Sequence, residues 1–472
     1  MSEAARNITL AWPDEILDLR DQLQALNHPL YIAGGPVRNA YLRRPIRDID
    51  LTVEANGIST ARKIANSVGG AFYPLDESRD VGRVIYSING VQHYIDVSSF
   101  RAETLEADLR ARDFTINALA VDLLGDLTLA YDPCDGLTDL QAKILRQCLP
   151  HSISDDPIRV LRAVRYSVQF SLKIEEGTRA AVRQNAPRLA EMSPERLRDE
   201  WFKLLELPNI KTACVIADRL GVLDVVLAGV FASAGEKASA FQIAHALRRF
   251  YTAVSPMRTD ETAAQFDLGM FVVSLDRYRA QLQAHLDYLW PNERPQFALL
   301  LLAGLLGNLS EHQLAKFAEQ FRLSNGEKSR LSLSVQCAPL VELIDLVDPV
   351  SIYRFWKAAG ESGVDAILLS LAQYLAAHDS DLEQDIWLRQ MERAQFLFHA
   401  YFVEHERYVA PPVLLNGDDL IAELALAPGK IIGELLNAIA EAQVSGAVNT
   451  REQALDLARL IINSRSNGWH HA

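Results

Sequence analysis

The sequence predicts an α+β protein in which a small N-terminal head with a mixed β-sheet is followed by an extended all-α neck, body and tail. In residues 29–130, short apolar runs such as IDLTVE, RVIYSI and HYIDVSSF alternate with turns. Asn89-Gly90 separates the last two runs and is a strong hairpin signal, because both residues tolerate positive φ. From Pro157 onward the apolar residues recur with a helical period, as in IRVLRAVRYSVQF and PERLRDEWFKLLEL, and strand-like alternation all but disappears.

The chain length of 472 residues favours about three domains. We expect a head over residues 1–150, a helical neck over 151–210, a helical body over 211–405 and a helical tail over 406–472. The turn-forming run Ala410-Pro411-Pro412 lies where the tail begins.

The composition excludes several classes of protein. The formal net charge of −14 argues against a uniformly basic, nucleic-acid-coating surface, but it leaves room for a local basic groove. We find no long uncharged apolar run and no basic-then-apolar leader, so we expect neither a membrane span nor a secretory signal. A cytoplasmic protein is therefore expected. The cysteines are widely spaced without a Cys-x-x-Cys pair, and we interpret them as reduced residues without a role: Cys134, Cys148, Cys214 and Cys337.

The run PLYIAGG ends in Gly34-Gly35 and is followed by Arg38 and then by Asp48-Ile-Asp50 in a strand-like segment. Positions i and i+2 of a strand project to one face, so the carboxylates of Asp48 and Asp50 should point together. Mg²⁺ prefers one or two carboxylates plus substrate phosphates, so this pair predicts a divalent-metal clamp. The glycine turn lets backbone N–H groups approach a triphosphate, and Arg38 adds a charge-assisted contact.

Five motifs follow one another along the first half of the chain. They are Gly34-Gly35-x-Val-Arg38 with Asp48-x-Asp50, Arg112-Asp-Phe-Thr-Ile-Asn117-Ala, Asp132-Pro-x-x-Gly136-x-x-Asp139-Leu, Asp155-Asp156-Pro-x-Arg159-x-Leu-Arg162 and Ser193-Pro-Glu195-Arg196-x-x-x-Glu200. Together they resemble motifs A to E of the class II tRNA nucleotidyltransferase and bacterial poly(A) polymerase family. Motif A departs from the family pattern at Asn39, where Asp is usual, and at Arg43, where Gly is common.

The resemblance implies a nucleotidyltransferase head with a nucleotide site built from these motifs. Arg112, Asp113 and Asn117 would hold the ribose and position the nucleotide, since a 2′-hydroxyl needs both donors and acceptors. Ser193 fits a helix N-cap, and the motif E charges that follow should brace the neck. Many enzymes of this superfold carry a third carboxylate on a neighbouring strand. Asp96 is the candidate, and its alternative is a carboxylate bonded to its own loop.

Motif D would select the base. Asp156 and Arg159 are three residues apart in a segment with helical periodicity, which predicts that they share one face. Cytosine and adenine each present an amino donor beside a ring-nitrogen acceptor, which a carboxylate beside a guanidinium matches, whereas uracil and guanine present the opposite pattern. The family pattern points to Asp156 and Arg159, with Asp155 and Arg162 in support. The helix phase leaves open which aspartate faces the base.

Longer members of the family often carry a metal-dependent HD domain with a signature like Leu-Leu-His-Asp-x-Gly-Lys. The similar segment here, Leu302-Ala-Gly-Leu-Leu-Gly307-Asn308, has Gly-Asn in place of His-Asp, which predicts neither a metal site nor phosphohydrolase activity. The one literal pair, His378-Asp379, lies in a polar stretch without flanking helical periodicity. The tail also resembles the family's C-terminal segment, which implies contact with the tRNA elbow, and its alternative is a purely structural helical cap.

The resemblance implies an enzyme that transfers CMP from CTP and AMP from ATP to a tRNA 3′-hydroxyl, with Mg²⁺ on Asp48 and Asp50. The same motifs serve A-adding, CC-adding and poly(A)-adding enzymes, and the C-terminal SRSNGWHHA, which is not Arg-rich, favours tRNA as the substrate. A catalytically silent RNA-binding protein is the alternative from another class. Neither DNA nor a membrane is expected as a partner, and the oligomeric state is left open.

Overall fold

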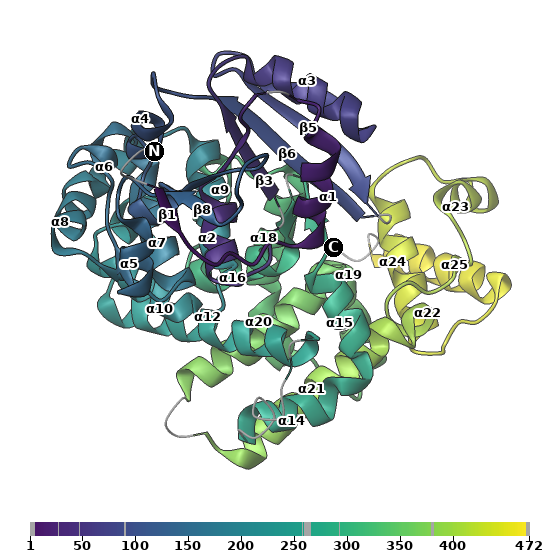
Figure 1. The fold of residues 1–472 in the computed structure, drawn as a ribbon. Helices are drawn as coiled ribbons and strands as arrows, with labels where there is room; N and C mark the ends of the chain where they lie inside the picture. Colours follow the sequence, from purple (N-terminus) through teal and green to yellow (C-terminus); the bar gives the residue numbers. More distant parts are fainter. Residues whose placement is uncertain are drawn as a thin grey trace. The chain divides into compact units, whose positions relative to one another are not determined.

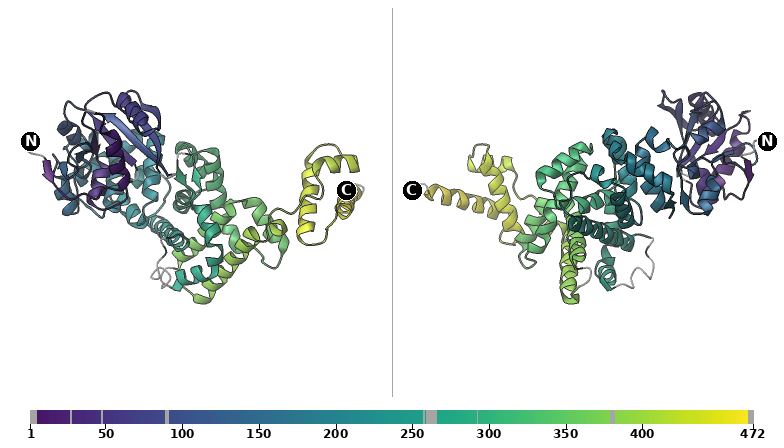
Figure 2. Two further views of the ribbon diagram at one scale, coloured as in Figure 1. Left: turned by 45° about the vertical axis from the view of Figure 1, so that its right-hand side comes forward. Right: turned by 90° about the vertical axis from the view of Figure 1, so that its left-hand side faces the viewer.

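The computed structural model describes residues 5–26, 28–46, 48–88, 91–256, 258, 266–291, 293–378 and 382–468. The chain divides into two compact units. Unit 1 comprises Met1–Glu200 and Val215–Val226, and unit 2 comprises Trp201–Cys214 and Leu227–Ala472. The predicted α+β class is confirmed, because the sheet lies in the N-terminal part and the chain after it is drawn almost wholly as helices (Figures 1 and 2).

Unit 1 holds a mixed sheet whose described strands follow the order β1-β8-β7-β2-β3-β6-β5-β4. The pair β3 and β6 is parallel, whereas the other pairs along the described sheet are antiparallel. The strands are β1 (Ala5–Asn7), β2 (Tyr31–Ala33), β3 (Asp48–Val53), β4 (Ala71–Asp76), β5 (Val81–Ile88), β6 (Val91–Ser99), β7 (Ala120–Asp122) and β8 (Leu129–Tyr131).

The apolar runs predicted as strands are β2, β3, β5 and β6. Strands β5 and β6 form an antiparallel hairpin whose last described pair is Ile88 with Val91, and the predicted turn residues Asn89 and Gly90 lie outside the described residues. Strands β1, β4, β7 and β8 were not predicted. Strands β1, β7 and β8 have three residues each, which offer little alternation to recognise.

Helix α3 (Gly57–Val68) packs on β5 and β6 through buried Ala61 and Ile64 (Figure 1). The two helices predicted from periodicity are α7 (Ile158–Gln169) and α9 (Pro194–Leu205). The short strands β9 (Ile144–Leu145) and β10 (Lys173–Ile174) pair in parallel beside α7. The remaining helices up to residue 226 are α1 (Asp14–Leu23), α2 (Gly35–Tyr41), α4 (Leu105–Arg110), α5 (Gly136–Gln141), α6 (Ser152–Asp155), α8 (Glu176–Asn185), α10 (Ile210–Arg219) and α11 (Leu223–Val226), with 3₁₀ turns at Thr115–Asn117 and Ala186–Glu191.

Unit 2 is built around α12 (Ala234–Val254), α16 (Gln296–Leu306), α18 (Asn325–Cys337) and α20 (Ser362–Ala377), which pack on one another. Its other elements are α14 (Phe266–Leu275), α15 (Arg279–Leu286), β11 (Leu289–Trp290), β12 (Arg294–Pro295), α17 (Glu311–Gln320), α19 (Pro349–Ala359), α21 (Gln384–Phe402), α22 (His405–Tyr408), α23 (Gly417–Leu424), α24 (Lys430–Val444) and α25 (Arg451–Gly468), with 3₁₀ turns at Asp276–Tyr278 and Ala338–Leu343. Helices α23 to α25 share a hydrophobic cluster that includes Leu420, Leu435 and Ala454.

Helix α16 is apolar and buried over its whole length, and it lies in the core of unit 2. Within the part of the chain that the structure describes, no helix combines the length and the apolar character that crossing a membrane requires.

Two bidentate Arg–Glu pairs of unit 2 differ in burial. Arg294 donates to both carboxylate oxygens of Glu327 at 2.7 and 2.9 Å, and both side chains are buried. Arg354 donates to both oxygens of Glu441 at 2.8 and 2.7 Å, but the Arg354 side chain is 64% exposed.

We expect Glu327→Gln to lower the free energy of unfolding by about 3–5 kcal/mol, because removal of one partner leaves a buried charge uncompensated. The matched variant Glu441→Gln should change it far less, because water screens the exposed pair. Urea unfolding of both variants measures the difference. Equal losses would contradict the assignment of Arg294 and Glu327 to the core.

Candidate functional site

Strand β3 carries the two predicted metal carboxylates on one face. Asp48 and Asp50 are exposed, and Ile49 between them is 3% exposed. The parallel register places Asp50 directly beside Asp96 of β6, and the antiparallel register places Asp96 beside Arg83 of β5. Residues paired in register share a sheet face, so Asp50, Asp96 and Arg83 form a row across three strands, and Asp48 lies on the same face two residues along β3.

Asp96 is occupied by a cross-strand partner. Arg83 Nε donates to Asp96 Oδ1 at 2.6 Å and Arg83 Nη2 to Oδ2 at 2.7 Å. This bidentate pair raises the pKa of Arg83, against the opposing effect of burial. Asp96 thus lies where a third carboxylate was predicted, but its two oxygens face a guanidinium rather than its own loop.

Asp50 has an elevated proton affinity. Desolvation by the surrounding protein, together with the neighbouring carboxylates of Asp96 and Asp48, raises the pKa of Asp50 to about 6, while the charge of Arg112 lowers it. The Asp50 side chain remains open to solvent, so partial desolvation and like-charge repulsion act together. A carboxylate in such surroundings is stabilised by any cation that binds beside it.

The donor set suits a metal that shares its ligands with a substrate. Among the described residues, no three His, Cys, Asp or Glu side chains converge as a closed metal cage. Asp48 and Asp50 supply two hard oxygen donors, and Mg²⁺ commonly binds through one or two carboxylates with substrate phosphates and water completing its shell. The residues present therefore fit a divalent cation whose remaining ligands come from a phosphate-bearing substrate.

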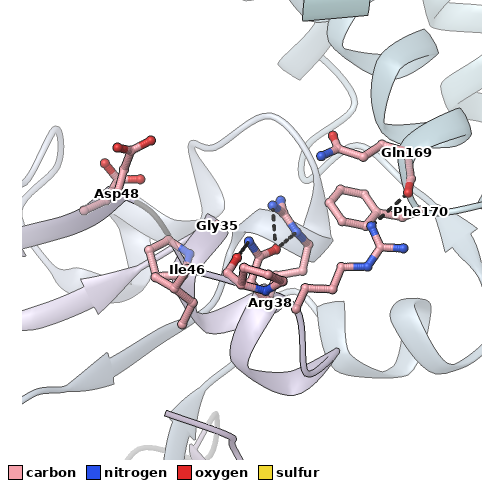
Figure 3. Close-up of a pocket in the computed structure, with 11 residues that line it drawn as sticks. Gly35, Arg38, Ile46, Asp48, Gln169 and Phe170 are labelled. Atoms are coloured by element: carbon pink, nitrogen blue, oxygen red, sulfur yellow. Dashed lines mark hydrogen bonds between the residues drawn. The ribbon is translucent and has the colours of Figure 1, made fainter. Parts of the chain in front are cut away.

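A pocket of about 460 Å³ opens beside these carboxylates, lined by Gly35, Arg38, Arg44, Asp48, Asp50 and Phe170 among others. Figure 3 shows Asp48 on its strand at one side of the pocket, Gln169 and Phe170 at the other, and Arg38 between them. The pocket thus has an acidic wall and a basic, aromatic wall.

Arg38 is a buried cation with uncharged partners. Its side chain is 6% exposed, and it donates to the amide oxygens of Asn117 and Asn39. Its guanidinium lies 4.3 Å from the ring centroid of Phe170. Within the described residues it forms no ion pair with a carboxylate, and burial lowers its pKa. Because buried charges are normally compensated, this arrangement favours an anion in the adjoining pocket.

The two departures from the family pattern of motif A have local explanations. Asn39 Nδ2 donates to the carbonyl of Pro45 at 3.1 Å while its Oδ1 accepts from Arg38, a combination that an ionised Asp side chain could not make. Arg43 has φ +52°, the left-handed conformation that glycine adopts without strain. The end of α2 and the turn up to Pro45 are thereby tied to Arg38 itself.

Asp113 is the centre of motif B. It is buried, and it accepts hydrogen bonds from Arg162 Nε at 2.7 Å, Asn117 Nδ2 at 2.9 Å and the Phe114 amide at 2.8 Å. Burial opposes ionisation, but the charge of Arg162 and these hydrogen bonds outweigh it and bring the pKa of Asp113 to about 2. Asp113 therefore binds protein groups and positions Asn117, which in turn contacts Arg38.

Arg112 lies directly over the glycine turn. A Cβ atom added to Gly34 would stand 2.8 Å from Arg112 Nη1, and Gly34 has φ +79°, so a side chain at this position would be both strained and obstructed. Arg112 Nη2 donates to Asp108 at 3.3 Å, and its buried Nε has no hydrogen-bond partner among the described residues. Arg112 retains donor capacity beside the Gly34 turn.

The prediction that Asp156 and Arg159 share a helical face is wrong. Asp156 has extended backbone (φ −144°, ψ 100°) and lies between α6 and α7, because the following Pro157 disfavours the helical conformation. Arg159 is in the first turn of α7, and its guanidinium donates to three backbone carbonyls, those of Ser152, Ala111 and Arg112. The neighbouring Asp155 is half exposed, 3.6 Å from His151.

Asp156 instead forms an ion pair with Arg196 of motif E. Arg196 Nη2 donates to Asp156 Oδ2 at 2.7 Å, and the Arg196 amide is capped by Ser193 Oγ at 3.4 Å. The predicted N-cap is therefore present. Glu200, one turn further along α9, accepts from Arg165 at 2.5 Å and is buried, in agreement with a bracing role for motif E.

Motif C holds a turn against motif B. Asp132 accepts from the amides of Gly136 and Leu137 at 2.6 and 3.1 Å. A Cβ on Gly136 would stand 2.1 Å from the carbonyl oxygen of Thr115, so only glycine fits there. Asp139 accepts from the Thr115 hydroxyl at 2.8 Å. These contacts assign motif C to support rather than to direct contact with the pocket.

Sequence reasoning did not single out Arg44, Phe170 or Arg83 as members of the site, and it gave Arg196 only a bracing role within motif E. Arg44 lies 4.8 Å from the ring centroid of Phe170 and donates to the Gln169 carbonyl at 2.9 Å. The sequence shows that Arg44 lies in an arginine-rich run, but its aromatic partner Phe170 lies far along the chain. Only tertiary structure joins the two.

Comparison with known proteins identifies the family. The chain matches the models for the poly(A) polymerase head domain over residues 30–146, the probable RNA- and SrmB-binding site of polymerase A over 171–232, and tRNA nucleotidyltransferase domain 2 over 293–458. It is 29% identical to a CC-adding tRNA nucleotidyltransferase of Geobacter sulfurreducens, with 90% of each chain covered. The chain belongs to the CCA-adding enzyme and poly(A) polymerase family.

Two further members of this family show its range. An A-adding tRNA nucleotidyltransferase of Deinococcus radiodurans is 29% identical, with 90% of this chain and 93% of the relative covered. The Thermotoga maritima CCA-adding enzyme, solved in complex with tRNA, has the same fold with a TM-score of 0.61 at 21% identity, with 98% of this chain and 100% of that chain covered.

The segment that resembles the family's HD signature lies in α16 and the turn after it. Helix α16 is buried, and the Gly304 position closely approaches Ile243 and Leu247. The absence of metal chemistry there stays a prediction. His378 bonds through Nδ1 to the Tyr374 carbonyl at 2.9 Å, and Asp379 lies outside the described residues.

The Asp113–Arg162 pair makes a pH-dependent contribution to stability. The pKa of Asp113 lies below its usual range, so this contribution is present above about pH 4 and is lost as the pH falls toward 2. We expect Asp113→Asn to lower the free energy of unfolding at pH 7 by on the order of 2–3 kcal/mol, with a difference from the unmodified chain that shrinks below pH 4. Urea unfolding across this pH range measures the difference.

Asp135→Asn is the control, because the Asp135 side chain is 71% exposed. It should show little change at either pH. A penalty for Asp113→Asn that is the same at pH 7 and at pH 2.5 would contradict the ion-pair assignment.

Proposed function

We propose that the chain is a tRNA nucleotidyltransferase that adds C, C and A to the tRNA 3′ end, transferring CMP from CTP and AMP from ATP with release of pyrophosphate. The observation that carries this proposal is that the carboxylates of Asp48 and Asp50 line the same pocket as the buried cation Arg38. A nucleoside triphosphate in the presence of a divalent cation has the charge pattern that such a pocket accommodates. The substrate class also agrees with the tRNA nucleotidyltransferases among the relatives.

Asp48 and Asp50 would hold Mg²⁺, which when bound supplies Lewis-acid activation of the tRNA 3′-hydroxyl and charge stabilisation at the α-phosphate. The Gly34-Gly35 turn lets the triphosphate approach the backbone, and Arg38 offsets its negative charge. Arg112 and Asn117 contact the sugar side of the nucleotide, and Asp113 orients Asn117. Asp96 restrains Arg83 and adds negative potential beside Asp50.

Base selection rests on Asp156 and Arg159. Asp156 presents an acceptor and Arg159 a donor, the pattern complementary to the Watson–Crick edges of cytosine and adenine. Arg196 holds one oxygen of Asp156 and Arg162 anchors α7 through Asp113, so both contribute by positioning, and Asp155 lies beside them. The tail, residues 406–472, contacts tRNA, and the reaction takes place in the cytoplasm.

A partial adder is the second candidate, because relatives that span about 90% of the chain include a CC-adding and an A-adding enzyme. The deciding experiment offers each labelled triphosphate, with Mg²⁺, to tRNAs that end at the discriminator base, at C and at CC. Sequential C, C and A addition supports the full activity, and addition to only some ends supports a partial adder. Long adenylate tails would indicate a poly(A) polymerase, and no incorporation would favour a silent RNA-binding protein.

We expect Asp48→Ala and Asp50→Ala each to reduce nucleotide incorporation by at least about a thousandfold, because each removes a metal ligand. Their far-UV circular dichroism should match that of the unmodified chain, since both side chains are exposed. Single-turnover incorporation at saturating CTP and Mg²⁺ is the measurement. Retention of full activity in both variants would exclude the proposed metal site.

Asp156→Asn should weaken the preference for CTP over UTP by about tenfold to a hundredfold, because an amide can present a donor as well as an acceptor to the base. The adjacent variant Asp155→Asn is the matched control and should change the preference much less. Competition between labelled CTP and UTP for one tRNA measures the ratio of kcat/KM values. A larger loss of selectivity in Asp155→Asn than in Asp156→Asn would show that Asp155, not Asp156, contacts the base.

A further inference from the structure

Two of the cysteines, which belong to separate segments of the chain, lie together in unit 1. Cys134 and Cys148 pack against the same small hydrophobic cluster, with Ala33, Leu109 and Ala118 at its centre. Both side chains are partly exposed, whereas Cys214 and Cys337 are buried. The spacing of the cysteines in the sequence did not reveal this neighbourhood, and the interpretation of the cysteines as reduced residues without a role stays a prediction.

The pKa values of the two thiols are shifted in opposite directions. The contact with Cys148 lowers the pKa of the Cys134 thiol, and the contact with Cys134 together with burial raises the pKa of Cys148. Thiol–disulfide exchange needs a thiolate that attacks first and a neighbouring thiol that resolves the mixed disulfide. Cys134 suits the first role and Cys148 the second.

The pair lies where two segments hold motif B in place. The backbone N–H of Cys148 donates to the carbonyl of Asp113 at 3.2 Å, and Gln147 forms an isolated antiparallel β-bridge with Phe114. Cys134 belongs to the motif C turn, which supports Thr115 through the close approach of Gly136. Each cysteine is thus part of a segment that contacts the motif B residues 113–115.

We propose that Cys134 and Cys148 form a modification site that exchanges with low-molecular-weight disulfides and weakens nucleotide binding when it is oxidised. The Cys134 thiolate attacks the disulfide RSSR and releases RS⁻, and Cys148 then loses its proton and displaces the second RS⁻ from the mixed disulfide. The cysteine pair loses two electrons and two protons, and RSSR becomes two RSH. Formation of the bond draws together the two segments that hold motif B, and so displaces the Cys148 contact to Asp113.

The experiment incubates the full chain with oxidised glutathione, blocks free thiols, and maps disulfide-linked peptides by mass spectrometry. We expect a Cys134–Cys148 link that dithiothreitol reverses and that is absent from Cys134→Ser and from Cys148→Ser. The variant Cys214→Ser/Cys337→Ser should form the link as the unmodified chain does. A chain that carries only glutathione adducts, or that stays fully reduced, overturns the proposal.

CTP binding to the oxidised and reduced chains, measured with Mg²⁺, tests the consequence. We expect the dissociation constant to rise about threefold or more on oxidation, and to be insensitive to oxidant in Cys134→Ser. An unchanged affinity in the linked chain would overturn the coupling to the nucleotide site. Because peptide mapping does not depend on catalysis, a failure of the proposed transferase activity remains distinguishable from a failure of the thiol proposal.

Discussion

The ion pair between the buried Asp113 and the partly exposed Arg162 is the interaction on which the rest of the site depends. A carboxylate removed from water is costly unless its charge and its lone pairs are satisfied, and Arg162, Asn117 and the Phe114 amide satisfy this one. Through Arg162 the pair fixes α7 against motif B, and through Asn117 it fixes Arg38. The end of the same helix carries Phe170, on which Arg38 stacks. One buried charge thereby links the helix of motif D, the loop of motif A and the pocket wall.

The acidic side of the pocket was predictable because it follows from local geometry. A strand has a period of two, so Asp48 and Asp50 share a face whatever the rest of the chain does. The partner of Asp96 was not predictable in the same way, since Arg83 reaches it only through the register of β5 and β6. The same holds for Phe170 beside Arg38 and for Cys134 beside Cys148, which are joined by tertiary packing rather than by sequence spacing.

Motif D shows how a periodicity argument fails at a helix boundary. The spacing of Asp156 and Arg159 matches one helical turn, but Pro157 keeps the residue before it extended, and the helix begins at Ile158. Asp156 is thereby free to pair with Arg196, a residue of the next motif. In the proposed function, an acceptor on Asp156 and a donor on Arg159 suit cytosine and adenine alike, so these two residues do not by themselves decide between C and A addition. The choice between cytosine and adenine must depend on other groups that contact the two bases differently.

We infer that Asp113, through Asn117 and Arg38, controls the phosphate side of the pocket without touching the nucleotide. It is tested most directly by a double-mutant cycle of Asp113→Asn and Arg38→Lys, with CTP affinity measured in Mg²⁺ under conditions in which all four chains are folded. We expect Asp113→Asn to weaken binding in the presence of Arg38 and to have little further effect once Arg38 is replaced. Additive losses in the double variant would contradict the claim.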